Sequence, residues 1–271
     1  MFENYNLKKR LNSMIKLDFR RLFTSTFFYI IVASCFVAPI LILVMTKMME
    51  GSPMTDQNGN PILDANGNIV LMEGFKNVWQ MLGSVSNSSS GMSMDLVSMC
   101  NINMMYFALA VLICMFIFQE FKSGYVKNLF TVRSNKVDYV ISKTLIGFVG
   151  GVIMIFCFFV GSLLGGAIAS ISFNMEGFNI YNIVMCLLSK FGLVLVFDGI
   201  FVLMSVVAKD KLWLSLLVGL GASMLLFMMI PLISPLDATI INVLLSLVGG
   251  LIFAFSLGVI SNTVLRKTSL I

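Results

Sequence analysis

Few residues in this chain could do chemistry, and their types exclude most classes of enzyme. The 271 residues include no histidine, which excludes HExxH zinc proteases, hydrolases with a Ser-His-Asp or Cys-His arrangement, and metal or haem sites with histidine ligands. The sequence also lacks a phosphate-binding GxxxxGK[ST] loop. We therefore predict no catalytic residue, no metal site and no ATP hydrolysis by the chain itself.

Asp198 is the one acidic residue deep within an apolar segment. A carboxylate in lipid is costly, so its side chain should face a cavity or a partner. Lys190 lies about 80° around the same helix, which argues against a direct ion pair. Asp198 is thus a candidate for a site in a substrate path or at a subunit interface. The alternative is a protonated, hydrogen-bonded structural residue.

A basic insert between two apolar segments, residues 118–144, holds the second set of candidates. Its cations are Lys122, Lys127, Arg133, Lys136 and Lys143. Residues 125–130 alternate polar and apolar side chains over barely two helical turns, which is too short for a stable isolated helix in water. We expect this short helix to be held by docking on another surface. The alternative is a plain basic loop.

Composition determines the class of protein that carries these residues. Hydrophobic residues make up 58% of the chain and charged residues 11%, and the mean hydropathy is +0.96. Soluble domains have about 45–50% and about 25%. The long apolar runs do not alternate as barrel strands do. The sequence therefore predicts an all-α integral membrane protein.

Six apolar segments are near the length needed to cross a bilayer. The predicted spans are residues 26–44, 101–118, 139–168, 180–208, 212–233 and 239–264, and residues 119–138 connect the second and third spans. The whole chain, residues 1–271, is predicted to form one transmembrane domain. Glycines concentrate in the third, fifth and sixth spans, where they favour close helix packing or, alternatively, helices that slide during transport.

The segment before the first span, residues 1–25, is predicted to be an amphipathic helix on the inner membrane surface. Its apolar residues cluster on one side and its lysines and arginines spread over the other. Asp18 falls on the apolar side and interrupts the pattern. A cleaved signal peptide is the alternative, but the charged region is long and no A-x-A-like cleavage site follows.

The polar loop after the first span, residues 45–99, contains two similar octads, DQNGNPIL and DANGNIVL. The Asn-Gly pairs at 58–59 and 66–67 are strong type I′ turn signals and predict a small β-hairpin. A calcium-binding loop is the alternative, but the bidentate glutamate at the twelfth loop position is missing.

The positive charges favour one orientation in the membrane. Of the 18 lysines and arginines, 15 lie on the side that holds both termini and the basic insert. The positive-inside rule places that side in the cytoplasm and residues 45–99 outside. The excess of positive charge is thus a topology signal, and we expect no nucleic-acid partner.

The basic insert resembles that of permease subunits of ABC-2-type exporters. The shared pattern is an acidic residue, a glycine, a short helix, a serine-basic pair and a lysine that opens the third span. Here the pattern corresponds to Glu120, Gly124, residues 125–130, Ser134 with Lys136, and Lys143. Lys136 stands where the family often has arginine, and Arg133 where it often has proline. The layout of six spans behind an amphipathic helix extends the resemblance over nearly the whole chain.

The resemblance implies an ATP-driven exporter subunit in the plasma membrane of a bacterium, working as a dimer with a second copy or a related permease chain. The implied cargo is hydrophobic or amphipathic: a peptide, a lipid-linked molecule or a drug-like molecule. ATP and Mg²⁺ would bind a separate ABC ATPase subunit, and this chain would bind no cofactor directly.

By the same resemblance, residues 125–130 form a coupling helix that seats in a cleft of the ATPase subunit. Its apolar contact is assigned to Val126, Leu129 and Phe130. The other implied coupling residues are Glu120, Lys122, Gly124, Tyr125, Lys127 and Lys143.

Two other classes of function compete with the exporter. One is a membrane-embedded immunity or binding protein that does not pump and acts through its outer loop. The other, an intramembrane enzyme, is disfavoured because the spans hold no paired carboxylates and no nucleophile–base pair.

Overall fold

The structure is a computed structural model, and it describes residues 2–55, 60–63, 67–72, 74–85, 100–132, 136–175 and 177–267, with the backbone alone for residues 2–8 and 132. The predicted turn residues 56–59 and 64–66, and Arg133 and Ser134 of the insert, lie outside these ranges.

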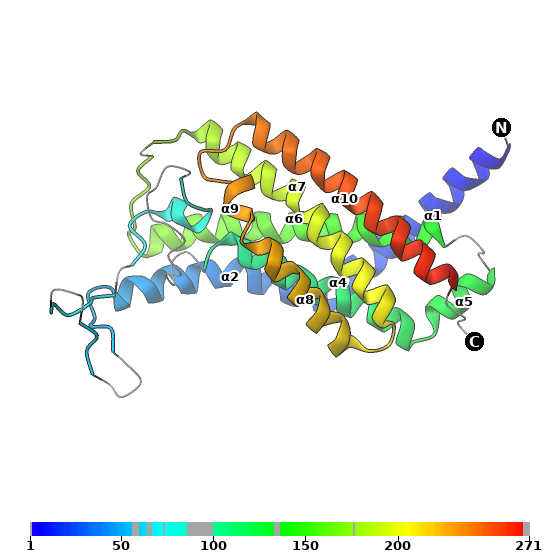
Figure 1. Ribbon diagram of the computed structural model, residues 1–271, viewed down its shortest axis with the longest axis horizontal. Coiled ribbons are helices and arrows are strands. Elements are labelled where there is room, and N and C mark those ends of the chain that lie inside the picture. Colours follow the sequence, from blue (N-terminus) through cyan, green and yellow to red (C-terminus); the bar gives the residue numbers. More distant parts are fainter. Residues whose placement is uncertain are drawn as a thin grey trace.

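The described chain folds into a bundle of helices that run roughly along one long axis (Figure 1). In chain order they are α1 (Phe2–Thr24), α2 (Thr26–Met49), η1 (Val78–Met81), η2 (Ile102–Met104), α4 (Met105–Lys122), α5 (Tyr125–Val132), α6 (Val137–Ile168), α7 (Ile180–Ala208), α8 (Leu212–Phe227), α9 (Ile230–Ile233) and α10 (Ile240–Lys267). The start of α1, the end of α10 and α5 lie at one end of the bundle, and the outer loop lies at the other.

Five helical stretches are long and apolar enough to cross a membrane. They are α2, η2 with α4, α6, α7 and α10. The fifth predicted span, residues 212–233, is instead divided into α8 and α9. Pro231 lies in the first turn of α9, and because proline lacks a backbone N–H it favours a helix start at this point. With 16 residues, α8 is about 24 Å long, short of a hydrocarbon core of about 30 Å.

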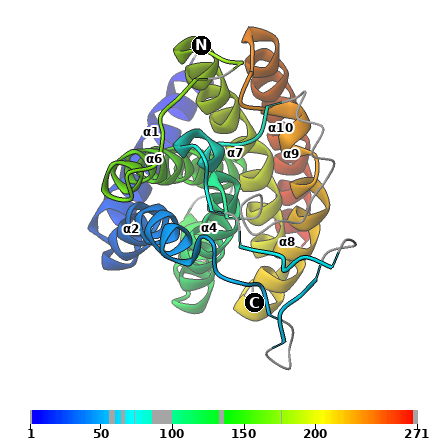
Figure 2. The same ribbon diagram turned by 90° about the vertical axis from the view of Figure 1, so that its left-hand side faces the viewer.

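The helix α7 lies in the middle of the bundle, against α10, α6, α4 and α8 (Figure 2). Its residue range is the one expected for the fourth span. Of its most apolar window, 78% is buried, against 22% for α2 and for α10. Accordingly, the polar side chains of Ser189, Lys190, Asp198 and Ser205 on α7 are buried.

Glycines bring two helix pairs unusually close. A Cβ on Gly161 of α6 would lie 2.2 Å from the carbonyl oxygen of Phe36 on α2. A Cβ on Gly250 of α10 would lie 2.5 Å from the carbonyl oxygen of Gly192 on α7. Close packing accounts for the glycines at these contacts, as small residues do between helices in lipid. Gly221 of α8, in contrast, has nothing within 4 Å of its Cβ position.

The outer loop holds isolated antiparallel bridges among the residues described there. They join Pro53 to Leu71, Thr55 to Pro61 and Leu63 to Ile69. The N–H of Val70 donates to the carbonyl oxygen of Ile62 at 2.8 Å, and Gly67 has a φ of 80°. No continuous strand forms among the residues that the structure describes in this loop, so the β-hairpin stays a prediction.

Candidate functional site

The short helix α5 begins where Gly124 ends the preceding turn. Gly124 has a φ of 72°, a left-handed conformation that glycine adopts without steric cost. Its N–H donates to the carbonyl oxygen of Phe121 at 3.1 Å. The predicted glycine therefore sets the angle at which α5 leaves α4.

The apolar side of α5 faces the rest of the chain. Val126 is 1% exposed, and Leu129 and Phe130 are half-buried against the core. The Phe130 ring lies edge-on to Tyr139 of α6, with 5.5 Å between ring centroids. The three residues that the resemblance assigns to an apolar contact with a partner thus pack mainly against other residues of this chain. Among residues 125–131 of α5, whose side chains the structure describes, the exposed ones are Lys127, Asn128 and Thr131, and Lys122 is exposed one turn earlier.

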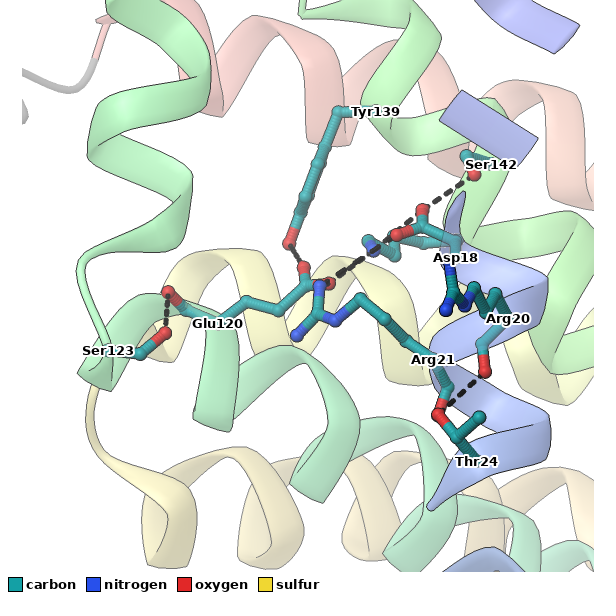
Figure 3. Close-up of polar contacts among 9 residues, drawn as sticks. Asp18, Arg20, Arg21, Thr24, Glu120, Ser123, Tyr139 and Ser142 are labelled. Atoms are coloured by element: carbon teal, nitrogen blue, oxygen red, sulfur yellow. Dashed lines mark hydrogen bonds and ion pairs between the residues drawn. The ribbon is translucent and has the colours of Figure 1, made fainter. Parts of the chain in front are cut away.

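Glu120 is fully buried in the last turn of α4 and accepts hydrogen bonds from three side chains (Figure 3). The Tyr139 hydroxyl donates to Glu120 Oε2 at 2.8 Å. Lys143 Nζ donates to Glu120 Oε1 at 2.5 Å, and Arg21 Nη1 donates to the same oxygen. One carboxylate therefore joins α4 to α6 and to α1.

Asp18 is the second buried carboxylate of the site and comes from α1. Its Oδ2 accepts from Lys143 Nζ at 2.8 Å and from the Ser142 hydroxyl at 2.7 Å. Arg21 Nη1 lies 3.8 Å from Asp18 Oδ1. We refer to Asp18, Arg21, Glu120 and Lys143 as the ion cluster.

Aromatic rings surround the two cations of the ion cluster. Lys143 Nζ lies 4.8 Å from the Phe116 ring centroid and 4.9 Å from that of Tyr139. The Arg21 guanidinium lies 4.6 Å from the ring centroid of Tyr125, the first residue of α5. Such cation–π contacts strengthen when water is excluded. Through Tyr125, the ion cluster extends to the base of α5.

The ion cluster balances two anions with two cations. Only Arg21 is partly exposed, at 33% of its side chain, whereas the side chains of Lys143, Asp18 and Glu120 are at most 1% exposed. Buried pairs cost desolvation, but removing one member strands a charge and costs about 3–5 kcal/mol. The ion cluster therefore fixes α1, α4 and α6 relative to one another.

Two further contacts tie this end of the bundle together. Arg10 Nε of α1 lies 2.7 Å from Asp138 Oδ2 in the first turn of α6. Lys136 Nζ donates to the carbonyl oxygen of Leu265 on α10 at 2.6 Å and lies 5.3 Å from the Phe130 ring centroid. The start of α6 is thus joined to the first and last helices.

Asp198 lies on α7, fully buried and separate from the ion cluster. A Cβ on Gly147 of α6 would lie 1.8 Å from Asp198 Oδ1, so the carboxyl group faces that glycine directly. Neither carboxyl oxygen has a hydrogen-bond partner in the part of the chain that the structure describes. Lys190 does not pair with it, as the helical spacing indicates, and instead donates to Asn103 Oδ1 at 2.9 Å.

The structure thus brings Glu120, Tyr125 and Lys143 of the predicted set together, but adds partners that sequence reasoning missed. These are Asp18, Arg21, Tyr139 and Ser142. One signal was present: Asp18 interrupts the apolar side of an amphipathic helix. An acid at such a position is explained by a buried cation elsewhere in the chain, which the spacing alone could not identify.

Comparison with known proteins assigns the chain to a family. Residues 14–225, most of the chain, match the family described as ABC-2 family transporter protein. Searches of curated proteins and of solved structures found no match. The matched residues include α5 and the whole ion cluster. With its apolar helices, the chain is a multi-pass membrane protein, and it belongs to the ABC-2 transporter family.

Proposed function

We propose that this chain is the permease subunit of an ATP-driven exporter and that α5 is its docking element for a separate ABC ATPase subunit. Family membership implies such an ATPase partner in general. The observation that supports the proposal is the way α5 is held against the rest of the chain. An eight-residue helix would not persist alone, yet here its inner side is packed and its base touches a buried ion cluster.

Docking uses the exposed polar side of α5 in this proposal. Lys127, Asn128 and Thr131 face outward, with Lys122 beside them, whereas Val126 is buried. ATP-driven closure of the ATPase subunits would push on α5. Because the ion cluster holds α1, α4 and α6 together, they would move as one body, in the manner of rigid-body switches.

Six crossings belong to the same proposal. The start of α1 and the end of α10 lie at the same end of the bundle, which requires an even number of crossings. We assign the sixth to α8 continued by α9, with the chain termini and α5 in the cytoplasm of a bacterium, as the distribution of positive charge favours.

The remaining parts follow from the proposed role. ATP and Mg²⁺ bind the ATPase subunit, and a second permease, either a copy or a related chain, completes the complex. The cargo in this proposal is hydrophobic or amphipathic, as the family resemblance implies. Within the residues that the structure describes, the spans hold few charged groups that could bind a strongly polar cargo.

Affinity purification from native membranes tests the docking proposal. The wild-type chain should bring down an ATP-binding subunit, and Lys127→Glu with Asn128→Asp should lose it while keeping the amount and fold of the chain. Lys211→Glu is the matched control, because Lys211 is also an exposed lysine at a helix connection, between α7 and α8. It should retain the subunit.

An intact wild-type complex without an ATPase would contradict the exporter and favour the passive immunity or binding protein. Retention of the ATPase by both variants would contradict docking through the polar side of α5.

A further inference from the structure

We propose that Asp198 is a second acceptor for Lys143. In another conformation of the protein, Lys143 leaves Asp18 and Glu120 and pairs with Asp198. This inference rests on the proposed function. The change of partner by Lys143 would transmit a movement of α5 to α7. We call this change of partner the exchange. In the conformation described above it has not occurred, and Lys143 pairs with Asp18 and Glu120.

The first argument is that Asp198 lacks a partner. It is fully buried, and neither oxygen accepts a hydrogen bond from any described residue. A lone carboxylate in such a place costs several kcal/mol. Lys190 lies about two turns from Asp198 on α7 and about 80° around it, whereas Lys143 lies on α6 one turn from Gly147, the glycine that Asp198 faces. Lys143 is therefore the cation to consider.

The second argument is the distance along α6. Gly147, which Asp198 faces, lies one helical turn after Lys143, so the two share a side of α6 about 6 Å apart along the axis. A small pocket adjoins both residues, and its other walls include Ile113, Phe116 and Ile146. A lysine side chain can extend over such a distance, and Gly147 places no side chain in its way.

The third argument is that the site left behind stays bonded. Glu120 keeps Tyr139 and Arg21, and Asp18 keeps Ser142. The number of carboxylates without a cation also stays the same. Asp198 is the one without a cation in the described arrangement, and after the exchange it would be Asp18, which keeps the hydrogen bond from Ser142.

Thermal unfolding of the full chain in lipid nanodiscs tests the pairing without an ATPase. In the wild type, Asp198→Asn should not lower the unfolding temperature, because neither carboxyl oxygen accepts a hydrogen bond from a described residue. In an Asp18→Asn, Glu120→Gln background Lys143 must turn to Asp198, so the same substitution should lower it by at least about 3 °C. Adding Lys143→Met should abolish that difference.

Equal effects of Asp198→Asn in both backgrounds would overturn the proposal. If the double background does not fold, Asp18→Asn alone provides the same comparison with a smaller expected shift.

The intact complex gives a second measurement. Asp198→Asn should still bring down the ATPase subunit, but ATP turnover of the complex should fall at least several-fold, with partial recovery in Asp198→Glu. Unchanged turnover in Asp198→Asn would overturn the exchange and leave the exporter standing. If no ATPase subunit is brought down but the effect of Asp198→Asn on the unfolding temperature still depends on the background, the exporter proposal is overturned and the pairing of Lys143 with Asp198 stands.

Discussion

At the scale of single residues, Glu120 has the largest expected effect. One carboxylate, fully buried, accepts from a tyrosine, a lysine and an arginine of two other helices. Two of these partners, Lys143 and Arg21, are cations, and Lys143 is 2% exposed, so its charge depends on the buried carboxylates around it. The charge on Glu120 is therefore what holds the three helices in register.

We expect Glu120→Ala to destabilise the protein by about 3–5 kcal/mol, because it leaves Lys143 and Arg21 with one anion between them. Glu120→Gln should cost less, since the amide oxygen can still accept. Thermal unfolding in nanodiscs measures both. Lys122→Ala, at an exposed position two residues along, is the control and should change stability by less than about 0.5 kcal/mol. Equal losses for the two alanine variants would contradict a central role for Glu120.

Residue-scale predictions from sequence succeed where a local rule applies. Gly124, which the family pattern singles out before the short helix, has a left-handed φ of 72°, a conformation that glycine adopts without steric cost. The pairing of Asp18 with Lys143 joins residues 125 positions apart in the chain, and no local pattern contains that information. The pattern of α5 showed an apolar side but not which surface covers it, because the tilt set at Gly124 decides that.

At the scale of helices, glycine positions decide which pairs approach closely. The α2–α6 contact depends on Gly161, whose missing side chain leaves room for the backbone of α2. Backbone atoms cannot rotate away as a side chain can, so a substitution here must move a helix.

Gly161→Val should therefore lower stability by at least about 2 kcal/mol through overpacking. The control is Gly221→Ala, since nothing lies within 4 Å of that Cβ position. There the gain in helix propensity should raise stability by up to about 1 kcal/mol. Unfolding in nanodiscs distinguishes the two, and tolerance of valine at 161 would contradict the close contact.

The bounds of some helices follow from the local sequence, whereas those of others depend on packing between helices. The range of α7 was predicted because a long apolar run between polar residues leaves little choice. Pro231, in the first turn of α9, accounts for the start of a new helix within residues 212–233, but how far the chain turns there depends on packing against α7. Ser189 of α7, for example, donates to Ser234 Oγ at 2.6 Å.

At the scale of the whole molecule, the question is how often the chain crosses the bilayer. Five long helices would put the two ends of the chain on opposite sides, whereas α1 begins and α10 ends at the same end of the bundle. If α8 and α9 make the sixth crossing, the residues between α9 and α10 must face the same side as the outer loop.

Thiol labelling in intact cells tests this arrangement. In a variant with its five cysteines replaced by alanine, single cysteines are introduced by Ile69→Cys, Thr239→Cys or Lys127→Cys, all at exposed positions. A membrane-impermeant maleimide should label the first two from outside and the third only after permeabilisation. Labelling of Thr239→Cys from the same side as Lys127→Cys would remove the sixth crossing. Labelling of Lys127→Cys from outside would contradict the docking proposal itself, because α5 would then face away from any cytoplasmic ATPase and could not transmit the movement of that ATPase to the bundle.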